Sequence, residues 1–251
     1  INFIDNQYTI NTSWGAIWNL AFMHSKSNGA NTRISVKNLF NVNTFDQVVV
    51  RNGFDLALDY EILAFNYFYS QNNLYSTQIN GEHVLPGSKI KFEWGGGYSR
   101  LNRIIPDYRN VEYRRVDSTQ NFSIPFSTTV QQDKAGRFFS DQLDNIGSGN
   151  FDFTLPIKLG ATRHELKIGT ALQYRDRDFA GRQLGYVRYK VSGSQIPSIS
   201  TMGVDSIFND SNMGPEGLMI REVTRKSDAY ESTQSIIAGY LQMESSFFEN
   251  K

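Results

Sequence analysis

Charged side chains that could bind a ligand occur in two stretches of the sequence. Asp107 and Arg109 lie close together in a segment that shows no clear periodicity. They could contact a ligand or a partner protein from an outer loop, and the simpler interpretation is an ion pair that shapes that loop. Arg175 and Arg177 belong to an alternating charged run, where they either attract anions at a rim or are simply solvated. These four residues are the candidate ligand-binding residues, and the sequence leaves both interpretations of each pair open.

Other kinds of site receive little support from the sequence. His24, His83 and His164 lie far apart without the HxH or HExxH spacing of a metal site, and we expect them to be exposed turn residues. The glycines at 95–97 lack the GxxxxGK[ST] frame of a phosphate-binding loop. Cysteine is absent, and no Ser/His/Asp arrangement or pair of carboxylates stands out. We therefore expect a protein that is not an enzyme and that holds no metal and no cofactor.

The composition bears on the class of protein. Lys and Arg number 25, as do Asp and Glu, so the chain of 251 residues has no formal net charge and no general reason to bind nucleic acid. Aromatic residues make up 14% of the chain, although the mean hydropathy is −0.43. No apolar run reaches the ~18 residues of a membrane-spanning helix. A membrane β-barrel needs only alternate apolar residues, so the composition is compatible with one.

Alternation with a period of two predicts a chain built mainly from β-strands. The clearest stretch is 90–98, where one face is apolar and aromatic: Ile90, Phe92, Trp94 and Tyr98. The other face carries Lys91, Glu93 and glycines. Similar patterns predict strands over 8–23, 32–40, 47–58, 59–71, 74–84, 150–157 and 164–177. Residues 229–248 give a mixed signal, in which helical spacing competes with strand alternation.

The predicted connections differ in length. Short turns are expected at 24–31, 41–46, 85–88 and 158–163, and the Pro86-Gly87 pair makes 74–84 and 89–100 a hairpin. Long irregular connections are expected at 101–136 and 178–227, with residues 137–143 either extended or part of a loop. Long loops on one rim and tight turns on the other are typical of outer-membrane barrels. Trp14, Trp18 and Trp94 then suit interfacial girdles, with sugar stacking as the alternative.

Several segments, in this order and spacing, resemble the middle of the β-barrel of a TonB-dependent outer-membrane receptor of the Bacteroidetes type. They are NLFN at 38–41, VRNG at 50–53, LYSTQINGEH at 74–83, IKFEWGGGYS at 90–99, PDYR at 106–109, LKIGTALQYRDRDF at 166–179 and YESTQSIIAGYLQME at 230–244. The resemblance implies an antiparallel transmembrane β-barrel of about 22 strands, of which residues 1–251 form a partial barrel domain. It also favours strand over helix at 229–248.

The resemblance further implies a function and partners. It implies energised uptake of a ligand across the bacterial outer membrane, with the lipid bilayer and, through an N-terminal plug, a TonB complex as partners. A surface lipoprotein lid is a further expected partner. The plug, the TonB-contacting box and a C-terminal strand ending in an aromatic residue are not found in the sequence. The chain starts at Ile1 and stops at Lys251 after an apolar-rich segment, so we expect a fragment of a longer protein.

Alternatives remain open at this point. A complete small barrel of eight strands is the alternative to a fragment. A soluble all-β carbohydrate-binding or glycan-active module would also use aromatic residues and alternating strands, and a structural outer-membrane barrel in a larger assembly would share the membrane pattern. The sequence does not distinguish a siderophore, a vitamin, a glycan or a peptide as the ligand. If the barrel interpretation is right, the face with Phe92 and Trp94 contacts lipid, and the face with Lys91 and Glu93 lines the lumen.

Overall fold

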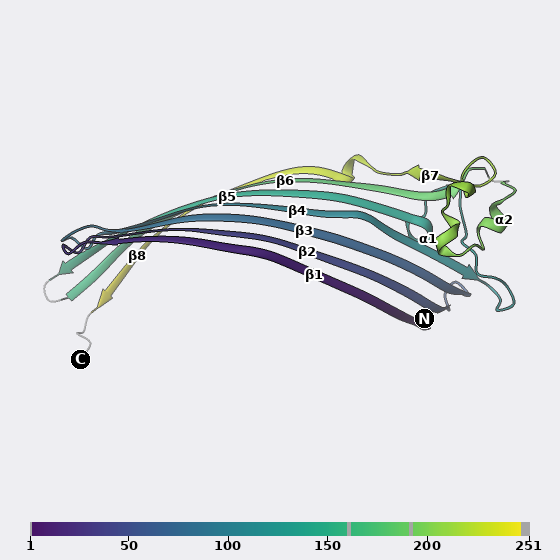
Figure 1. The fold of residues 1–251 in the computed structure, drawn as a ribbon, viewed down its shortest axis with the longest axis horizontal. Coiled ribbons are helices and arrows are strands. Elements are labelled where there is room, and N and C mark those ends of the chain that lie inside the picture. The colour runs from purple at the N-terminus through teal and green to yellow at the C-terminus, as the bar shows by residue number, and fades with distance from the viewer. Residues whose placement is uncertain (1, 160–161, 191–192, 247–251) are drawn as a thin grey trace.

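The computed structural model describes residues 2–159, 162–190 and 193–246, which form one antiparallel sheet of eight strands (Figure 1). The strands are β1 (Asn2–Ser25), β2 (Asn31–Asp55), β3 (Tyr60–Val84), β4 (Lys91–Arg115), β5 (Gly136–Leu159), β6 (Thr162–Arg188), β7 (Leu218–Glu222) and β8 (Ala229–Ser246). Strands β1 to β6 have 24 to 27 residues each, against ~5–6 in a typical sheet. The all-β, antiparallel prediction is confirmed.

The strands follow one another across the sheet in chain order up to β6. Beyond β6, two strands share one position, because β7 pairs with 184–188 and β8 pairs with 163–180 of β6. The short 3-10 helix η2 (Lys226–Asp228) separates them. In the part of the chain that the structure describes, β1 and β8 are not paired with each other, so the sheet is open. These two edge strands run in the same direction.

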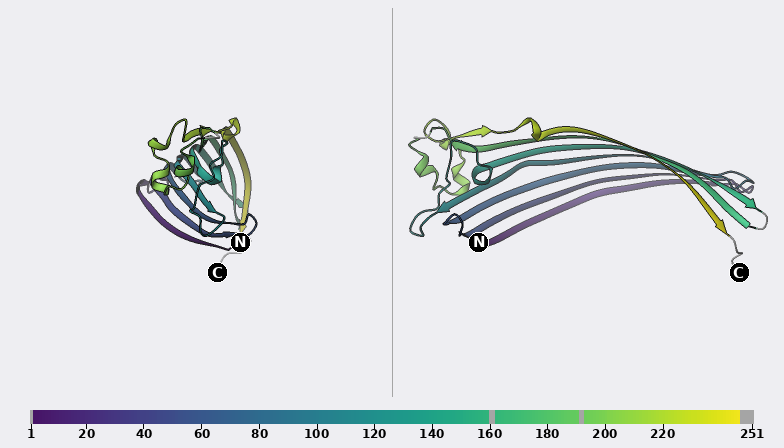
Figure 2. Two further views of the ribbon diagram at one scale, coloured as in Figure 1. Left: turned by 90° about the vertical axis from the view of Figure 1, so that its right-hand side faces the viewer. Right: turned by 180° about the vertical axis from the view of Figure 1, so that it is seen from behind.

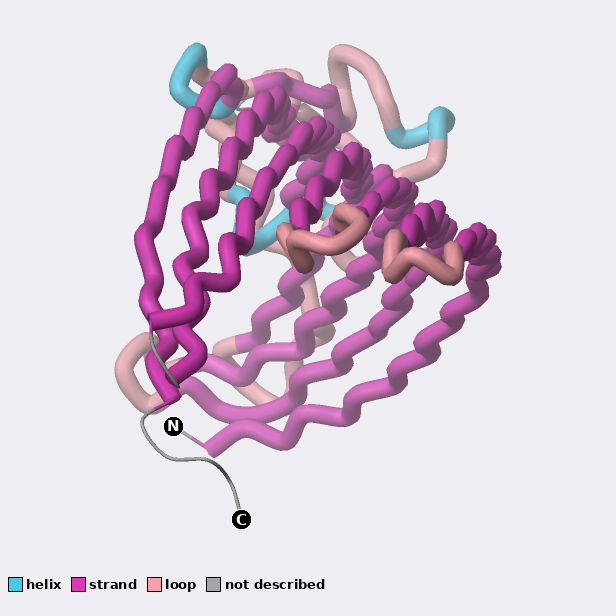
Figure 3. Tube along the Cα trace, turned by 90° about the vertical axis from the view of Figure 1, so that its left-hand side faces the viewer, coloured by secondary structure: helices cyan, strands magenta, loops and turns pink. Residues whose placement is uncertain are grey.

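The two ends of the sheet carry different connections (Figures 1 and 2). Short turns over 26–30 and 85–90 lie at one end, which we call the turn end and which faces the viewer in Figure 3. The other end, the loop end, has a short turn at 56–59 and both long connections, 116–135 and 189–228. The prediction that the two long connections share a side is confirmed. Of the predicted turn at 158–163, residues 158–159 and 162–163 belong to the paired ends of β5 and β6, and residues 160–161 lie outside the described residues.

The long connections contain only short helices. They are α1 (Gln132–Ala135), α2 (Ile196–Ile199), α3 (Val204–Ile207) and the 3-10 helices η1 (Asp210–Asn212) and η2. Among the described residues, no helix combines the length and the apolar character needed to cross a membrane. We call residues 116–135 together with 193–228 the loop cap.

Several predicted boundaries are wrong because the strands are longer than the pattern indicated. The expected turn at 41–46 lies inside β2, where Asn41 and Asn43 pair with β1 on one side and β3 on the other. These two ladders satisfy the backbone, so the polar side chains do not end the strand. Residues 59–71 and 74–84 form one strand, β3. Residues 137–143 belong to β5, and 178–188 continue β6.

The expected loop at 101–136 is also half strand, because β4 continues to Arg115. The register of β4 against both neighbours shifts by one residue between Ile105 and Tyr108. This bulge lies at Pro106, which has no backbone N–H to donate to the ladder. A bulge inverts the alternation of every residue after it, which explains why the period was lost in the sequence. Asp107 and Arg109 therefore lie in a strand and not in a loop.

Two local predictions are confirmed. The turn between β3 and β4 contains Pro86 and Gly87, and Gly87 has a φ of 73°, a value that glycine adopts without strain. The 74–84 and 89–100 hairpin follows from it. The segment at 229–248 is a strand over 229–246, so the helical alternative is wrong there, and residues 247–248 lie outside the described residues.

One face of the sheet is aromatic at the turn end. We call the face that carries Trp94 the aromatic face and the opposite one the polar face. Large apolar side chains form an exposed band on the aromatic face, from 38% exposed at Phe40 to 81% at Ile237. This apolar band comprises Ile10, Trp14, Trp18, Leu20, Phe22, Phe40, Tyr75, Ile79, Tyr98, Phe151, Ile168, Leu172, Tyr174, Ile237, Leu241 and Met243.

The hydrophobic core lies at the loop end of the same face. Val111 and Tyr113 of β4 are 3% and 4% exposed, and they pack against apolar side chains of the loop cap. Those partners are Ile124, Phe126, Ala135, Ile196, Ile199, Ile207 and Leu218. The Tyr113 hydroxyl donates to the carbonyl of Met202 at 2.8 Å, and Tyr186 of β6 stacks on Phe208. The loop cap therefore covers the aromatic face at the loop end and leaves the apolar band uncovered.

Candidate ligand-binding site

The first candidate pair, Asp107 and Arg109, forms a three-residue ion cluster with Arg137 of β5. Nε and Nη2 of Arg137 donate to the two carboxylate oxygens of Asp107 at 2.9 and 2.8 Å. Nε of Arg109 donates to the same carboxylate. The Asp107 side chain is only 19% exposed. The ion pair of the simpler interpretation is therefore present, although it joins two strands and does not shape a loop.

The charge state of Asp107 follows from two opposing effects. Burial raises the pKa of its carboxyl, and the hydrogen bonds from Arg137 and Arg109 lower it. The hydrogen bonds and the nearby positive charges prevail, so the pKa of Asp107 lies below its ordinary value. Asp107 is therefore ionised at neutral pH, close to the bulge and to the loop cap.

The second candidate pair, Arg175 and Arg177, is held by a carboxylate that the sequence did not reveal. Asp144 of β5 is fully buried and pairs directly with Arg177 in the ladder. Arg175 donates to its two oxygens from Nε and Nη2 at 3.1 Å each, and Arg177 does so at 2.6 and 3.0 Å. Gln142 donates a further hydrogen bond at 3.0 Å. One carboxylate thus orients two guanidinium groups.

Asp144 lies beyond the apolar band, on the loop-end side of Gly147, the residue paired with Tyr174. Burial raises the pKa of its carboxyl, but the hydrogen bonds from Arg177, Arg175 and Gln142 outweigh burial and hold the pKa well below its ordinary range. Asp144 is therefore a permanent anion at neutral pH, as its role in fixing two guanidinium groups requires.

The structure does not bring the four candidate residues together. Counting along the ladders, Arg109 and Arg137 share the face of Tyr174, which is the aromatic face. Arg175 and Arg177 lie on the polar face, as the alternation predicted. The two clusters are therefore separate sites on opposite sides of the sheet.

The arginines of the second cluster line a cavity together with β8. The cavity has a volume of about 350 Å³ and is lined by Arg175, Arg177, Tyr230, Ser232, Thr233 and Gln234. In the ladder, Ser232 faces Arg177 and Gln234 faces Arg175. Tyr230 stacks on Phe179 with ring centroids 5.3 Å apart. Sequence reasoning missed the β8 residues because their neighbours are set by pairing between distant segments.

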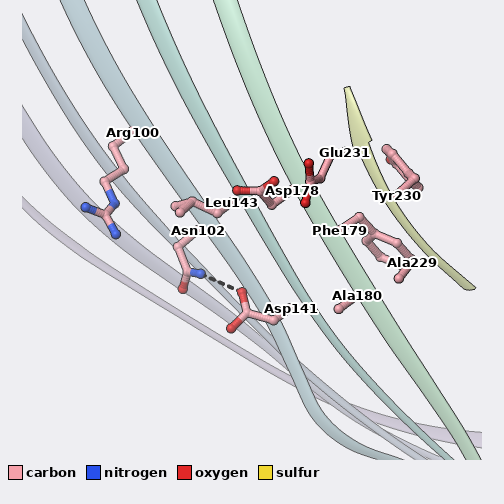
Figure 4. A pocket seen from close by; sticks show the side chains of 10 residues that line it. All are labelled: Arg100, Asn102, Asp141, Leu143, Asp178, Phe179, Ala180, Ala229, Tyr230 and Glu231. Carbon is pink, nitrogen blue, oxygen red and sulfur yellow. Dashed lines mark hydrogen bonds between the residues drawn. The ribbon is translucent and has the colours of Figure 1, made fainter. Parts of the chain in front are cut away.

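A larger cavity lies nearby and has the opposite charge (Figure 4). It has a volume of about 770 Å³, and its lining includes three acidic residues and one basic residue, Asp141, Asp178, Glu231 and Arg100. Nδ2 of Asn102 donates to Oδ1 of Asp141 at 2.8 Å, the contact drawn in Figure 4. By the ladder register these three acidic residues share the aromatic face, beyond the apolar band. The larger cavity is therefore mainly acidic, whereas Arg175 and Arg177 make the smaller one basic.

The histidines do not form a metal site within the described residues, where no group of three or more His, Cys, Asp and Glu side chains has a suitable arrangement. His83 accepts a hydrogen bond at Nε2 from Nε1 of Trp94 at 3.2 Å and stacks on Phe92. His164 is only 7% exposed. The expectation that all three are exposed turn residues is wrong in its placement, since they lie in β1, β3 and β6, and only His24 is exposed.

Both ion clusters supply fixed charge and hydrogen-bond donors, which suits recognition of a charged group. Both clusters join neighbouring strands. The Asp144 cluster is the better candidate site, because its two arginines line a cavity. Comparison with known proteins adds no assignment of family or function: no protein-family model and no curated protein matches the chain.

Proposed function

We propose that this chain is part of an outer-membrane β-barrel that imports a ligand by TonB-dependent transport. The observation that carries the proposal is the uncovered apolar band on the aromatic face, backed by charged and polar groups on the other face. The proposal assigns the protein no enzymatic activity and no cofactor. Its partners are the lipid bilayer, a TonB complex acting through a plug and a surface lipoprotein, and nucleic acid is not among them.

The dimensions of the apolar band suit a bilayer. On β1 it extends over 13 residues, from Ile10 to Phe22, and on β6 over seven, from Ile168 to Tyr174, which lie on either side of the ~9–11 residues that a tilted membrane-spanning strand needs. Its side chains include Leu172 at 53% and Leu241 at 69% exposed. Soluble monomers rarely expose contiguous apolar patches larger than a few hundred Å². Lipid chains would cover this band without any further protein layer.

The polar face at the same depth suits a water-filled lumen or a polar plug. Nζ of Lys91 lies 3.1 Å from Glu82 and 2.9 Å from Glu93. Nζ of Lys167 continues the network at 3.8 Å from both Glu93 and Asp152. Groups with side chains about a third exposed would be costly on a lipid-facing surface and are ordinary in a barrel interior. The contrast between the two faces supports the lipid-and-lumen assignment.

The unpaired edges and the loop asymmetry support a larger barrel, and the resemblance implies about 22 strands for it. β1 and β8 each have one partner strand among the described residues and present a free row of backbone groups on the other side. Membrane proteins close such edges, because hydrocarbon offers no hydrogen-bonding partner. The transport step itself rests on the resemblance of the sequence segments to TonB-dependent receptors.

The soluble glycan-binding alternative needs a second layer on the aromatic face. A β-sandwich packs two sheets face to face at about 10 Å. In the described residues, no element packs on the apolar band, and the loop cap lies at the loop end. A purely structural barrel would share the apolar band and differ only in lacking energised uptake.

The first experiment addresses the membrane assignment. Cells producing the full-length protein are fractionated, and the membranes are washed with carbonate and then extracted with dodecyl maltoside. We expect the protein in the outer-membrane fraction, released by detergent and not by carbonate. A protein that is soluble without detergent would contradict the proposal.

The second experiment addresses transport. Uptake of labelled ferric siderophore, cobalamin and maltooligosaccharide is compared in cells with and without the gene, and with and without a protonophore. We expect uptake of one probe that needs both the gene and the proton gradient. Uptake that persists in the presence of the protonophore would favour a passive barrel, and a membrane protein without effect on any probe would favour a structural one.

A further inference from the structure

We infer that Arg175 and Arg177, together with Ser232 and Gln234 of β8, form a binding site for an oxyanion, namely a carboxylate or phosphate group of a ligand. The site lies on the polar face just beyond the apolar band. The inference deepens the proposed function and rests on it in one respect, that the polar face lines the path of the ligand. It names the chemical class of the ligand that this wall recognises.

The contacts to Asp144 leave donors for a ligand on each arginine. Both guanidinium groups approach the carboxylate side-on, with Nε and Nη2. Because a guanidinium is planar and carries five N–H groups, Nη1 of each points away from Asp144. The side chains of Arg175 and Arg177 are 32% and 28% exposed, and Arg177 also has a side-chain hydrogen bond with Tyr230. Asp144 thus fixes two guanidinium groups in position without using all their donors.

The charge balance favours an anion. Two arginines against one aspartate leave a surplus of one positive charge in the cluster. Arg103 of β4 shares the polar face, because it pairs with Gln142, and it adds a further positive charge nearby. The acidic residues of the same strand, Asp176 and Asp178, lie on the opposite face. The cluster therefore carries a net positive charge, which favours an anion over a cation as its ligand.

The neighbouring strand completes the cavity. Ser232 and Gln234 face the two arginines across the ladder and line the same cavity of about 350 Å³. A hydroxyl and a carboxamide are neutral donors that complement guanidinium groups around an oxyanion. The stacked rings of Tyr230 and Phe179 lie beside them and offer a flat apolar surface to the remainder of a ligand. The site therefore suits a small organic acid or a phosphorylated compound.

The test is calorimetric titration of the full-length protein in dodecyl maltoside with sodium citrate and with inorganic phosphate. We expect binding of at least one probe, weakened about tenfold or more by Arg175→Gln and by Arg177→Gln, because each removes a charge-assisted hydrogen bond. Arg182→Gln is the matched control. Arg182 holds Glu222 with the same side-on geometry, at 3.0 and 2.9 Å, on the aromatic face, so its loss leaves binding unchanged.

A second variant tests the same site if the arginine variants do not fold. Gln234→Leu removes an amide at similar size, does not touch the Asp144 cluster and is expected to weaken binding about threefold to tenfold. Absence of binding of both probes to the wild-type protein overturns the inference, as does binding that neither the arginine nor the Gln234 variant weakens. In either result the protein would still be extracted by detergent from the outer membrane, which separates this failure from that of the proposed function.

Discussion

The aromatic face has two halves with opposite surroundings. At the loop end, Tyr113 and Val111 are 4% and 3% exposed beneath the loop cap. At the turn end, Leu241 and Ile237 are 69% and 81% exposed. Side-chain alternation along the strands therefore determines which apolar side chains share this face. The long connections at the loop end bury those nearest to them, and the short turns at the other end leave the rest exposed. The half without a cover is the half that the proposed function places in a membrane.

The largest expected effect concerns the covered half. Phe126→Ala removes a side chain that is 3% exposed from the core of the loop cap, and we expect a loss of ~3–5 kcal/mol in the stability of that region. Hydrogen exchange of residues 193–228 in detergent measures it. Val116→Ala, at a residue 72% exposed in the loop cap, is the control and should change little. An equal effect of both variants would mean that the cap has no packed core.

The next effect concerns the uncovered half. Leu172→Arg places a charge in the apolar band, and we expect a loss of ~2–4 kcal/mol in lipid, because lipid-facing charges near the bilayer midplane cost about this much. Urea unfolding of the full-length protein in phosphatidylcholine vesicles measures the loss. Gln173→Arg, the neighbouring position on the polar face, is the control. If the two substitutions had equal effects, the two faces would not differ in their surroundings.

A smaller effect depends on pH and concerns the Asp107 ion cluster, which lies between the two halves of the aromatic face. The pKa of Asp107 is lowered in the folded protein, so its ion cluster stabilises the fold above the ordinary carboxyl pKa and loses this contribution as the pH falls through the lowered value. Discounted for the exposure of its arginines, the contribution is on the order of 1 kcal/mol. Proteolysis of the loop cap between pH 7 and pH 3 should accelerate at the acid end. Asp107→Asn should flatten this profile, and an unchanged profile would exclude the cluster as its cause.

The smallest effect concerns one hydrogen bond of the cap. Tyr113→Phe keeps the ring and removes the hydroxyl that donates to the Met202 carbonyl, which should cost ~0.5–1.5 kcal/mol. Burial raises the pKa of Tyr113 to about 12, so the hydroxyl stays protonated and the bond persists into alkaline pH. Hydrogen exchange near Met202 between pH 7 and pH 9 tests both statements. A fall in the protection factor of the wild-type protein over this range, after correction for the base-catalysed intrinsic exchange rate, would show that the bond is lost.

The sequence predicted what depends on neighbours along the chain. The β3–β4 hairpin, the shared side of the long connections and the common face of Arg175 and Arg177 all follow from local alternation or turn residues. Prediction from the sequence failed where one residue shifts the side-chain alternation of a strand, as at Pro106. It also failed where polar residues such as Asn41 continue a strand because both neighbouring strands pair with that strand. Strand lengths were underestimated for the same reason.

The candidate site was predictable only in part. Alternation identified two arginines on one face, but Asp144 and Gln234 enter the site through pairing between segments far apart in the chain. No local pattern encodes that register. The core of the loop cap was also missed, because Ile196 and Ile199 belong to a helix of only four residues that leaves no periodic signal.

The parallel direction of β1 and β8 limits how this sheet can be closed. In an antiparallel barrel each strand runs opposite to both neighbours, so the total number is even. Here eight strands fill seven positions, since β7 and β8 share one beside β6. Joining the two edges directly, or joining two copies in a ring, would set two strands parallel. Antiparallel closure therefore requires an odd number of additional strands between β8 and β1.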